Sequence, residues 1–325
     1  RCAPDRFRVK HSMPILEPTN ENIELSVHAL RQGKPVAFAT ETVYGLGCDT
    51  FNTIAIERVY VMKNRPMDNP MIAHILESSW VARLTNSWDA MCESLAEAFW
   101  PGPLTLVVRK HERVPAEACG GRETIAIRCP ANSVARKLLL TFGGPVSAPS
   151  ANRSGYISPT SAEHVESEFG SDLSILDGGI CEEGIESTVL SLLSEPAILR
   201  PGTISRKQIE QVIGPVLQKP TTVQSESPGS SAVHYAPSTP TKLKSRKEIA
   251  TLQDPECFVL SIHETPALCG HHIKMPSSPK QYGAVLYSSL READSKKVSA
   301  IMIEQPPIET SWDAINDRLS RCTTK

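Results

Sequence analysis

Polar residues that could bind an anionic substrate occur in four short segments, and the first two suit phosphate or carboxylate groups. Residues 39–47 carry two threonines and two glycines, which can present hydroxyl and backbone N–H groups to a ligand. Lys63 and Arg65 stand one residue apart, and Asn69 and His74 follow them. Two neighbouring cations can neutralise a triphosphate or a carboxylate. By themselves residues 39–47 also fit a turn, Lys63 fits a helix C-terminus and His74 fits a core position. A ligand-binding role and a purely structural role therefore both stay open for these residues.

The other two segments follow apolar runs that indicate buried strands. Arg128 ends the run 124–127, and an arginine at the carboxyl end of a strand can anchor an anion. Residues 147–152 are small, so a substrate could approach their backbone closely. The sequence holds no GxxxxGK[ST] phosphate loop, no GxSxG and no HExxH, so we expect an anion site on a less familiar scaffold.

Alternating helix and strand patterns must bring these segments together, and they predict an α/β domain over residues 14–213. The polar segments lie beside predicted strands. The predicted strands are 35–39, 71–76, 104–109, 124–128, 145–149, 173–177, 188–193 and 197–200. The predicted helices are 20–33, one that begins after Asn52, 87–100, 134–140 and 204–213.

A second, smaller α/β unit is predicted at the C-terminus. Residues 214–240 are rich in Pro, Ser and Thr and have the composition of an extended linker. In the unit 241–325 we expect a parallel pair of strands, 257–262 and 298–303, joined through a helix at 281–293, and a further helix at 312–319. Residues 1–13 are interpreted as an N-terminal tail.

Composition excludes several classes of protein. The chain has 325 residues, which favours two domains, and its net charge of -2 with 5% aromatic residues argues against a nucleic-acid clamp. No apolar run is long enough to cross a membrane. The nine cysteines are scattered and form no CxxC pair, which favours reduced thiols over a disulfide framework or a zinc ribbon.

In order and spacing, the polar segments resemble successive motifs of the YrdC-like threonylcarbamoyl-AMP synthases. The matching segments are 39–47, Lys63-Asn64-Arg65-Pro66 with Asn69-Pro70, 100–105, 124–130, 147–152, Glu186-Ser187-Thr188-Val189 and Arg200-Pro201-Gly202. Ser227-Pro228-Gly229 and His234-Tyr235-Ala236-Pro237 resemble the linker of the two-domain (long) form. The resemblance implies a twisted mixed α/β sheet around a basic cavity, with a small C-terminal Rossmann-like α/β domain.

The same resemblance implies a reaction. Members of the family convert L-threonine, bicarbonate or carbon dioxide, and ATP into threonylcarbamoyl-AMP and pyrophosphate. The adenylate is then used to modify the adenosine next to the anticodon of tRNA. An unstable carbamate anion must meet a polyphosphate, so positive charge and shielding from water are the main requirements.

The resemblance also implies roles for individual residues. We expect Lys63 and Arg65 to neutralise the phosphates, while Ser150 and Asn152 orient them. The residues implied for ATP binding are Arg65, Asn69, Thr124, Ser150, Ser158, Arg200 and Tyr235. Those implied for threonine binding are Thr42, His74, Arg128, Ala148, Ser187 and Thr188. Because Tyr235 lies in the linker, the linker is expected to fold over the cavity as a lid.

Further expectations concern cofactors, partners and location. Magnesium is expected with ATP, although no acidic cluster identifies its protein ligands. The product would pass to a tRNA threonylcarbamoyl-transferase complex, a weak contact with tRNA is allowed, and no membrane is involved. The cysteines favour the cytoplasm, while the basic residues of the first ten positions leave a mitochondrial presequence open.

Departures from the family pattern and two alternatives remain. Asn64 stands where Gly is common, and residues 230–233 lack the basic character that is usual in the linker. One alternative is a non-catalytic protein of the same fold that binds tRNA or double-stranded RNA. The other is a carbamoyl-transfer module of the hydrogenase-maturation type, which the missing CxxC pairs disfavour.

Overall fold

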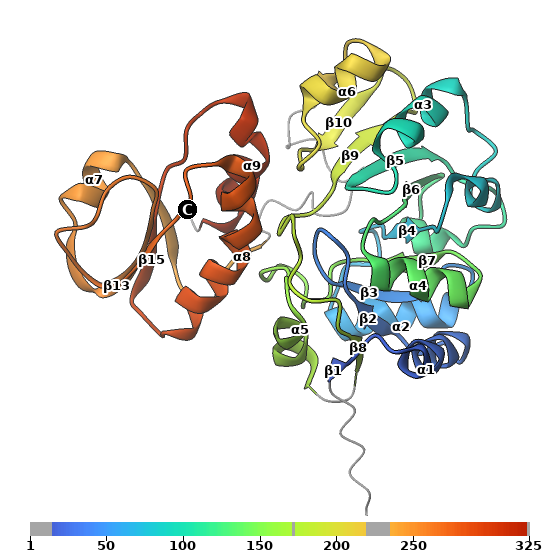
Figure 1. The fold of residues 1–325 in the computed structure, drawn as a ribbon, viewed down its shortest axis with the longest axis horizontal. Helices are drawn as coiled ribbons and strands as arrows, with labels where there is room; N and C mark the ends of the chain where they lie inside the picture. Colours follow the sequence, from blue (N-terminus) through green and yellow to red (C-terminus); the bar gives the residue numbers. More distant parts are fainter. Residues whose placement is uncertain (1–14, 171–172, 219–234, 324–325) are drawn as a thin grey trace, which may run out of the picture.

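The chain folds into two α/β units that pack side by side, as the computed structural model shows (Figure 1). The structure describes residues 15–170, 173–218 and 235–323. The predicted tail at 1–13 and the linker motif at 227–234, including residues 230–233, lie outside the described residues. The domain boundaries at 213 and 240 stay predictions.

The larger unit is built on a mixed sheet, which confirms the predicted fold. Its strands run in the order β1-β8-β2-β3-β7-β4-β6-β5-β9-β10-β11, with both parallel and antiparallel neighbours. They are β1 (Ile15–Leu16), β2 (Val36–Phe38), β3 (Gly45–Asp49), β4 (Ile72–His74), β5 (Leu104–Arg109), β6 (Thr124–Arg128), β7 (Val146–Ala148), β8 (Ser174–Leu176), β9 (Thr188–Ser191), β10 (Ala197–Arg200) and β11 (Leu217–Gln218).

Helices cover both faces of this sheet. They are α1 (Asn20–Arg31), α2 (Thr53–Lys63), α3 (Ala90–Phe99), α4 (Ser133–Phe142), α5 (Ala162–Phe169) and α6 (Arg206–Ile213), with 3-10 turns η1 (Ser78–Arg83) and η2 (Ala116–Cys119). Successive side chains of a strand point to opposite faces. Accordingly Val36 and Phe38 of β2 pack with α1 and α4, whereas Ala37 between them packs with α2.

The helix starts follow from local sequence. Thr19 caps α1 by accepting a hydrogen bond from the backbone of Asn22, and Asn52 caps α2 by accepting one from the backbone of Ala55. Helix α2 ends at Lys63, and its C-cap residue Asn64 is left-handed, with a φ of 50° and a ψ of 47°. Asparagine tolerates this conformation better than most residues, which explains why it can stand where the family commonly has Gly.

The smaller unit is a four-stranded parallel sheet in the order β12-β15-β13-β14. Its elements are β12 (Thr241–Lys244), α7 (Arg246–Ala250), β13 (Gln253–Ser261), β14 (Leu268–Lys274), α8 (Pro279–Ser295), β15 (Ala300–Glu304), η4 (Thr310–Trp312) and α9 (Asp313–Cys322). The predicted parallel pair is present as β13 and β15, with α8 between them in the chain.

Helices α8 and α9 face the larger unit (Figure 1). Their side chains share one buried apolar cluster with three residues of that unit, Val43, Ile157 and Ile185. All three belong to loops that run beside the cavity described below. The smaller unit is therefore seated directly on the loops that carry the predicted site.

Candidate active site

The polar segments predicted from sequence meet around one cavity of about 50 Å³. It lies beside the β2–β3 loop and the ends of β4, β6, β7 and β10. The predicted residues that line it are Thr42, Arg65, His74, Arg128, Ala148, Ser150, Ser187, Arg200 and Tyr235. Of the predicted residues that the structure describes, Lys63, Asn69, Thr124, Asn152, Ser158 and Thr188 do not line it.

Arg128 is fixed by a buried ion pair at the carboxyl end of β6. Its Nη2 lies 2.7 Å from Oε1 of Glu41, and its Nη1 donates to Oγ1 of Thr42 at 2.8 Å. Burial by itself would raise the pKa of Glu41, but the charge of Arg128 and hydrogen bonds outweigh it and lower that pKa. This part of the wall therefore holds a cation whose charge is already compensated.

His74 presents an uncharged imidazole beside Arg128. The residue ends β4, is 4% exposed, and makes a T-shaped contact with the Phe38 ring. Burial, and next the charge of Arg128, lower its pKa to about 3. Its Nδ1 has no hydrogen-bond partner among the described residues. A neutral ring with a free polar atom can bind a substrate hydroxyl or amine without adding charge.

Ser187 and Arg200 are held together by hydrogen bonds and by close packing of the backbone at Gly202. The Nε and Nη2 atoms of Arg200 donate to the carbonyl oxygen of Ser187 at 3.1 and 3.0 Å. The hydroxyl of Ser187 also contacts that of Thr105 at 2.7 Å. A Cβ on Gly202 would lie 2.3 Å from the backbone nitrogen of Thr188, so only glycine permits this approach.

Arg65 is held from behind by the loop that follows α2. Its Nη2 donates to Oδ1 of Asn69 at 2.6 Å and to the carbonyl oxygen of Pro70 at 2.9 Å, and its Nε donates to the carbonyl of Asn69. Burial lowers the pKa of Arg65 to about 10, which leaves it protonated at neutral pH. Asn69 thus positions Arg65 and does not itself reach the cavity.

Lys63 supports the loop that carries Ser150. Its side chain is buried, and its Nζ donates to the carbonyl oxygens of Ser150, at 2.6 Å, and Asn152. Burial, and next the charge of Arg65, lower the pKa of Lys63 well below its ordinary value. The Asn152 side chain bonds the carbonyls of Arg153 and Tyr156. Direct contact of Lys63 or Asn152 with phosphate stays a prediction.

Three other predicted residues lie outside the wall for separate reasons. Thr124 begins β6, four positions before Arg128, and pairs with Arg109. The hydroxyl of Thr188 donates to the carbonyl of Ile204 at 2.7 Å. The hydroxyl of Ser158 donates to a carboxylate oxygen of Glu186 at 2.6 Å. The hydroxyls of Thr188 and Ser158 therefore form hydrogen bonds within the protein.

The sequence did not single out Glu41, Glu186 or Arg318. For Glu41 the sequence does contain a local signal, its place between two threonines in a glycine-containing loop. A carboxylate that is buried there needs a cation or hydrogen-bond donors as partners. Glu186 lines the cavity and pairs with Arg318 of α9 at 2.9 Å. No local pattern marks Arg318, since its partner is 132 residues away.

Two features do not occur in the part of the chain that the structure describes, a membrane-spanning helix and a metal-binding cluster. None of its helices is long and apolar enough to cross a membrane. Within the same residues, no group of three or more His, Cys, Asp or Glu side chains could hold a metal ion.

Two family models match consecutive parts of the chain. Residues 28–202 match the Sua5/YciO/YrdC family, whose description is "Telomere recombination". Residues 204–324 match "Threonylcarbamoyl-AMP synthase, C-terminal domain". The two matches together span both units of the structure.

Full-length relatives agree with these matches. The threonylcarbamoyl-AMP synthase of Bacillus subtilis is 36% identical over 94% of this chain and 94% of its own length. That of Pyrococcus abyssi is 44% identical over 70% of each chain. The crystal structure of Pyrococcus abyssi Sua5 complexed with L-threonine has a TM-score of 0.86 at 34% identity, covering 95% of this chain and 98% of that one.

Proposed function

Because the chain belongs to the Sua5/YciO/YrdC family in its two-domain form, we propose that it is a threonylcarbamoyl-AMP synthase. As a nucleotidyltransferase it would convert L-threonine, bicarbonate and ATP into threonylcarbamoyl-AMP, pyrophosphate and water. The observation that carries this proposal is one cavity lined by Arg65, Arg128 and Arg200. Three buried cations in one wall suit a reaction between an anion and a polyphosphate.

The threonine half of the cavity is proposed at Thr42, His74, Arg128, Ala148 and Ser187. Arg128 would bind the carboxylate of threonine, for which its fixed guanidinium is suited. The free Nδ1 of His74 is available to the hydroxyl or amine. The solved relative that was crystallised with L-threonine supports this choice of substrate.

Two steps would follow in the proposed reaction. The amine of threonine attacks carbon dioxide formed from bicarbonate, a C–N bond forms and a proton leaves, giving a carbamate. A carbamate oxygen then attacks the α-phosphorus, and the bond to the β-phosphate breaks to release pyrophosphate. Arg65 and Arg200 would stabilise the charge that develops, while burial excludes the water that would hydrolyse the carbamate.

ATP would bind at Arg65, Ser150, Arg200 and Tyr235, with Asn69 and Ser158 behind them. The cavity of about 50 Å³ is far smaller than the ~300–1,000 Å³ of typical ligand pockets. Tyr235 lines it and is itself buried. We therefore infer that the segment around Tyr235 moves aside to admit the nucleotide, as a lid would.

Magnesium is proposed to enter with ATP. Glu186, the carboxylate of the cavity wall, is already paired with Arg318 and bonded to Ser158. We therefore assign no protein ligand to the ion and expect phosphate oxygens and water to hold it. The product would serve tRNA modification through a transferase complex, and the free cysteines support a reducing compartment such as the cytoplasm.

Pyrophosphate release tests the proposal. Release from ATP should require both threonine and bicarbonate, and Arg65→Ala should abolish it, because the variant removes a cavity cation. Arg83→Ala, which removes an exposed arginine of η1, is the matched control and should leave release unchanged. Release that ignores threonine would contradict the substrate assignment. Tight tRNA binding without any release would favour the RNA-binding alternative.

A further inference from the structure

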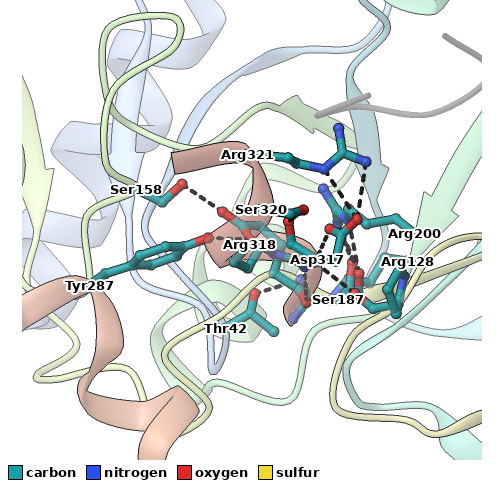
Figure 2. A network of polar contacts seen from close by, with 12 residues as sticks. Thr42, Arg128, Ser158, Ser187, Arg200, Tyr287, Asp317, Arg318, Ser320 and Arg321 are labelled. Carbon is teal, nitrogen blue, oxygen red and sulfur yellow. Dashed lines mark hydrogen bonds and ion pairs between the residues drawn. The ribbon is translucent and has the colours of Figure 1, made fainter. Parts of the chain in front are cut away.

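The smaller unit contributes a buried arginine that pairs with a carboxylate of the cavity wall. Arg318 of α9 is 1% exposed and lies beside Asp317 in the polar network of Figure 2. Its Nε donates to Oε2 of Glu186 at 2.9 Å. Its Nη1 donates to the carbonyl of Pro201 at 2.8 Å and to Oδ2 of Asp317 at the same distance. Because Glu186 lines the cavity, one unit compensates a charge in the site of the other.

Glu186 carries a full negative charge beside the proposed nucleotide half. Burial by itself would raise its pKa, but the charges of Arg318 and Arg200 and the hydrogen bond from Ser158 lower that pKa to about 2. Tyr287 of α8 also donates to its Oε2 at 2.9 Å. A carboxylate here would repel the phosphates of ATP unless a cation stayed paired with it.

Arg318 also contacts the proposed lid. Its guanidinium carbon lies 5.4 Å from the centroid of the Tyr235 ring. The same ring stacks on Tyr287, with centroids 5.7 Å apart and planes inclined by 26°. An arginine near an aromatic ring stabilises it, more so when both are desolvated. Tyr235 is therefore held by two side chains of the smaller unit, Arg318 and Tyr287.

We propose that Arg318 is a positioning residue of the active site, which contacts the lid residue Tyr235 and through which the C-terminal unit neutralises Glu186 so that ATP can bind. The proposal rests on the proposed synthase function, because it assigns Arg318 to the nucleotide half of that site. It gives the C-terminal unit a direct part in nucleotide affinity. Loss of Arg318 would act on ATP and leave the threonine half, at Arg128 and His74, in place.

A second ion pair between the units provides a matched control. Arg291 of α8 lies 2.9 Å from Glu168 of α5, and their side chains are 14% and 12% exposed. Neither residue lines the cavity. If the arginines of the smaller unit only fastened the two units together, Arg291→Gln and Arg318→Gln would have the same effect on kinetics.

The test compares Michaelis constants and ATP binding. In the full chain, Arg318→Gln should raise KM for ATP at least about tenfold and change KM for threonine less than about twofold. Adding Glu186→Gln should restore most of the ATP affinity, because a neutral amide no longer repels phosphate. Arg291→Gln should leave both constants within about twofold of the wild type. Calorimetric titration with ATP alone should give the same order of affinities.

Each contrary outcome is informative. An equal rise in both constants, or no rescue by Glu186→Gln, would overturn the proposal. If Arg318→Gln does not fold, the single variant Glu186→Gln tests the proposal. This variant keeps the arginine and removes the carboxylate, so KM for ATP should fall or stay the same. A tenfold rise in KM for ATP would overturn the proposal. If the wild type binds ATP yet releases no pyrophosphate, the proposed function fails, while the calorimetric comparison still tests Arg318.

Discussion

His74 should stay uncharged well below the pH at which histidine ordinarily titrates. Its ring is buried at the end of β4, and its pKa falls from 6.5 to about 3 because of burial and the nearby charge of Arg128. As pH falls, the unfolded chain therefore takes up this proton first, which favours unfolding. The stabilisation is fully present above about pH 6.5 and is lost as pH falls toward about 3.

The size of the effect follows from the shift. Each pKa unit corresponds to about 1.4 kcal/mol, so titration from about pH 6.5 down to about pH 5 should remove about 2 kcal/mol of stability. His74→Gln lacks the imidazole and cannot lose this contribution. The wild type should therefore lose about 2 kcal/mol relative to the variant over that interval.

Urea unfolding of both proteins between about pH 8 and about pH 5 measures this difference. Above about pH 7.5 both side chains are neutral, so the difference there reports packing alone and serves as the control. If the difference in unfolding free energy between the wild type and His74→Gln does not change with pH, the reasoning is refuted. An NMR titration of the His74 ring with a midpoint near 6.5 would refute it as well. The same neutrality predicts that His74 causes no inflection in KM for threonine near neutral pH.

Two further predictions concern the scaffold behind the cavity. Lys63→Met removes the Nζ donor from the carbonyls of Ser150 and Asn152 and should cost roughly 1–3 kcal/mol for each of them. Turnover should also fall, and unchanged stability in urea would contradict the supporting role of Lys63. Gly202→Ala should destabilise the fold by about 1–3 kcal/mol and raise KM for threonine. The reason is that the new Cβ would lie 2.3 Å from the backbone nitrogen of Thr188 and would displace Ser187. A wild-type KM in this variant would contradict the prediction, because it would mean that the backbone moves without disturbing Ser187.

Strands with apolar, β-branched sequences were predicted closely, whereas small or polar strands were missed. The bounds of β5, β6 and β10 agree with the prediction because these strands are buried between packed layers. Strand β3 begins within residues 39–47, which by themselves fit a turn, since Gly-Leu-Gly-Cys-Asp lacks an apolar alternation. A Cβ on Gly47 would lie 2.7 Å from both Phe38 and Val146, so the neighbours explain a residue that propensity disfavours.

The smaller unit was predicted only in part. Strands β12 and β14 were missed, and so were α7 and, in the larger unit, α5. Strand β14 is mostly exposed or half-buried and carries two histidines, Cys269 and Lys274, so its side chains give little periodic signal. Its backbone pairing with β13, and not its hydrophobicity, defines it.

The two halves of the site both contain arginine, but they differ in whether a carboxylate compensates the charge of that arginine. Arg128 is paired with Glu41, so that half is close to neutral and suits threonine, whose amine and carboxylate cancel. Arg65 donates to the uncharged oxygens of Asn69 and Pro70, and no carboxylate among the described residues forms an ion pair with it. Its charge is therefore left for a polyanion. The pairing of each arginine, set by tertiary packing, thus favours phosphate at Arg65 and amino acid at Arg128.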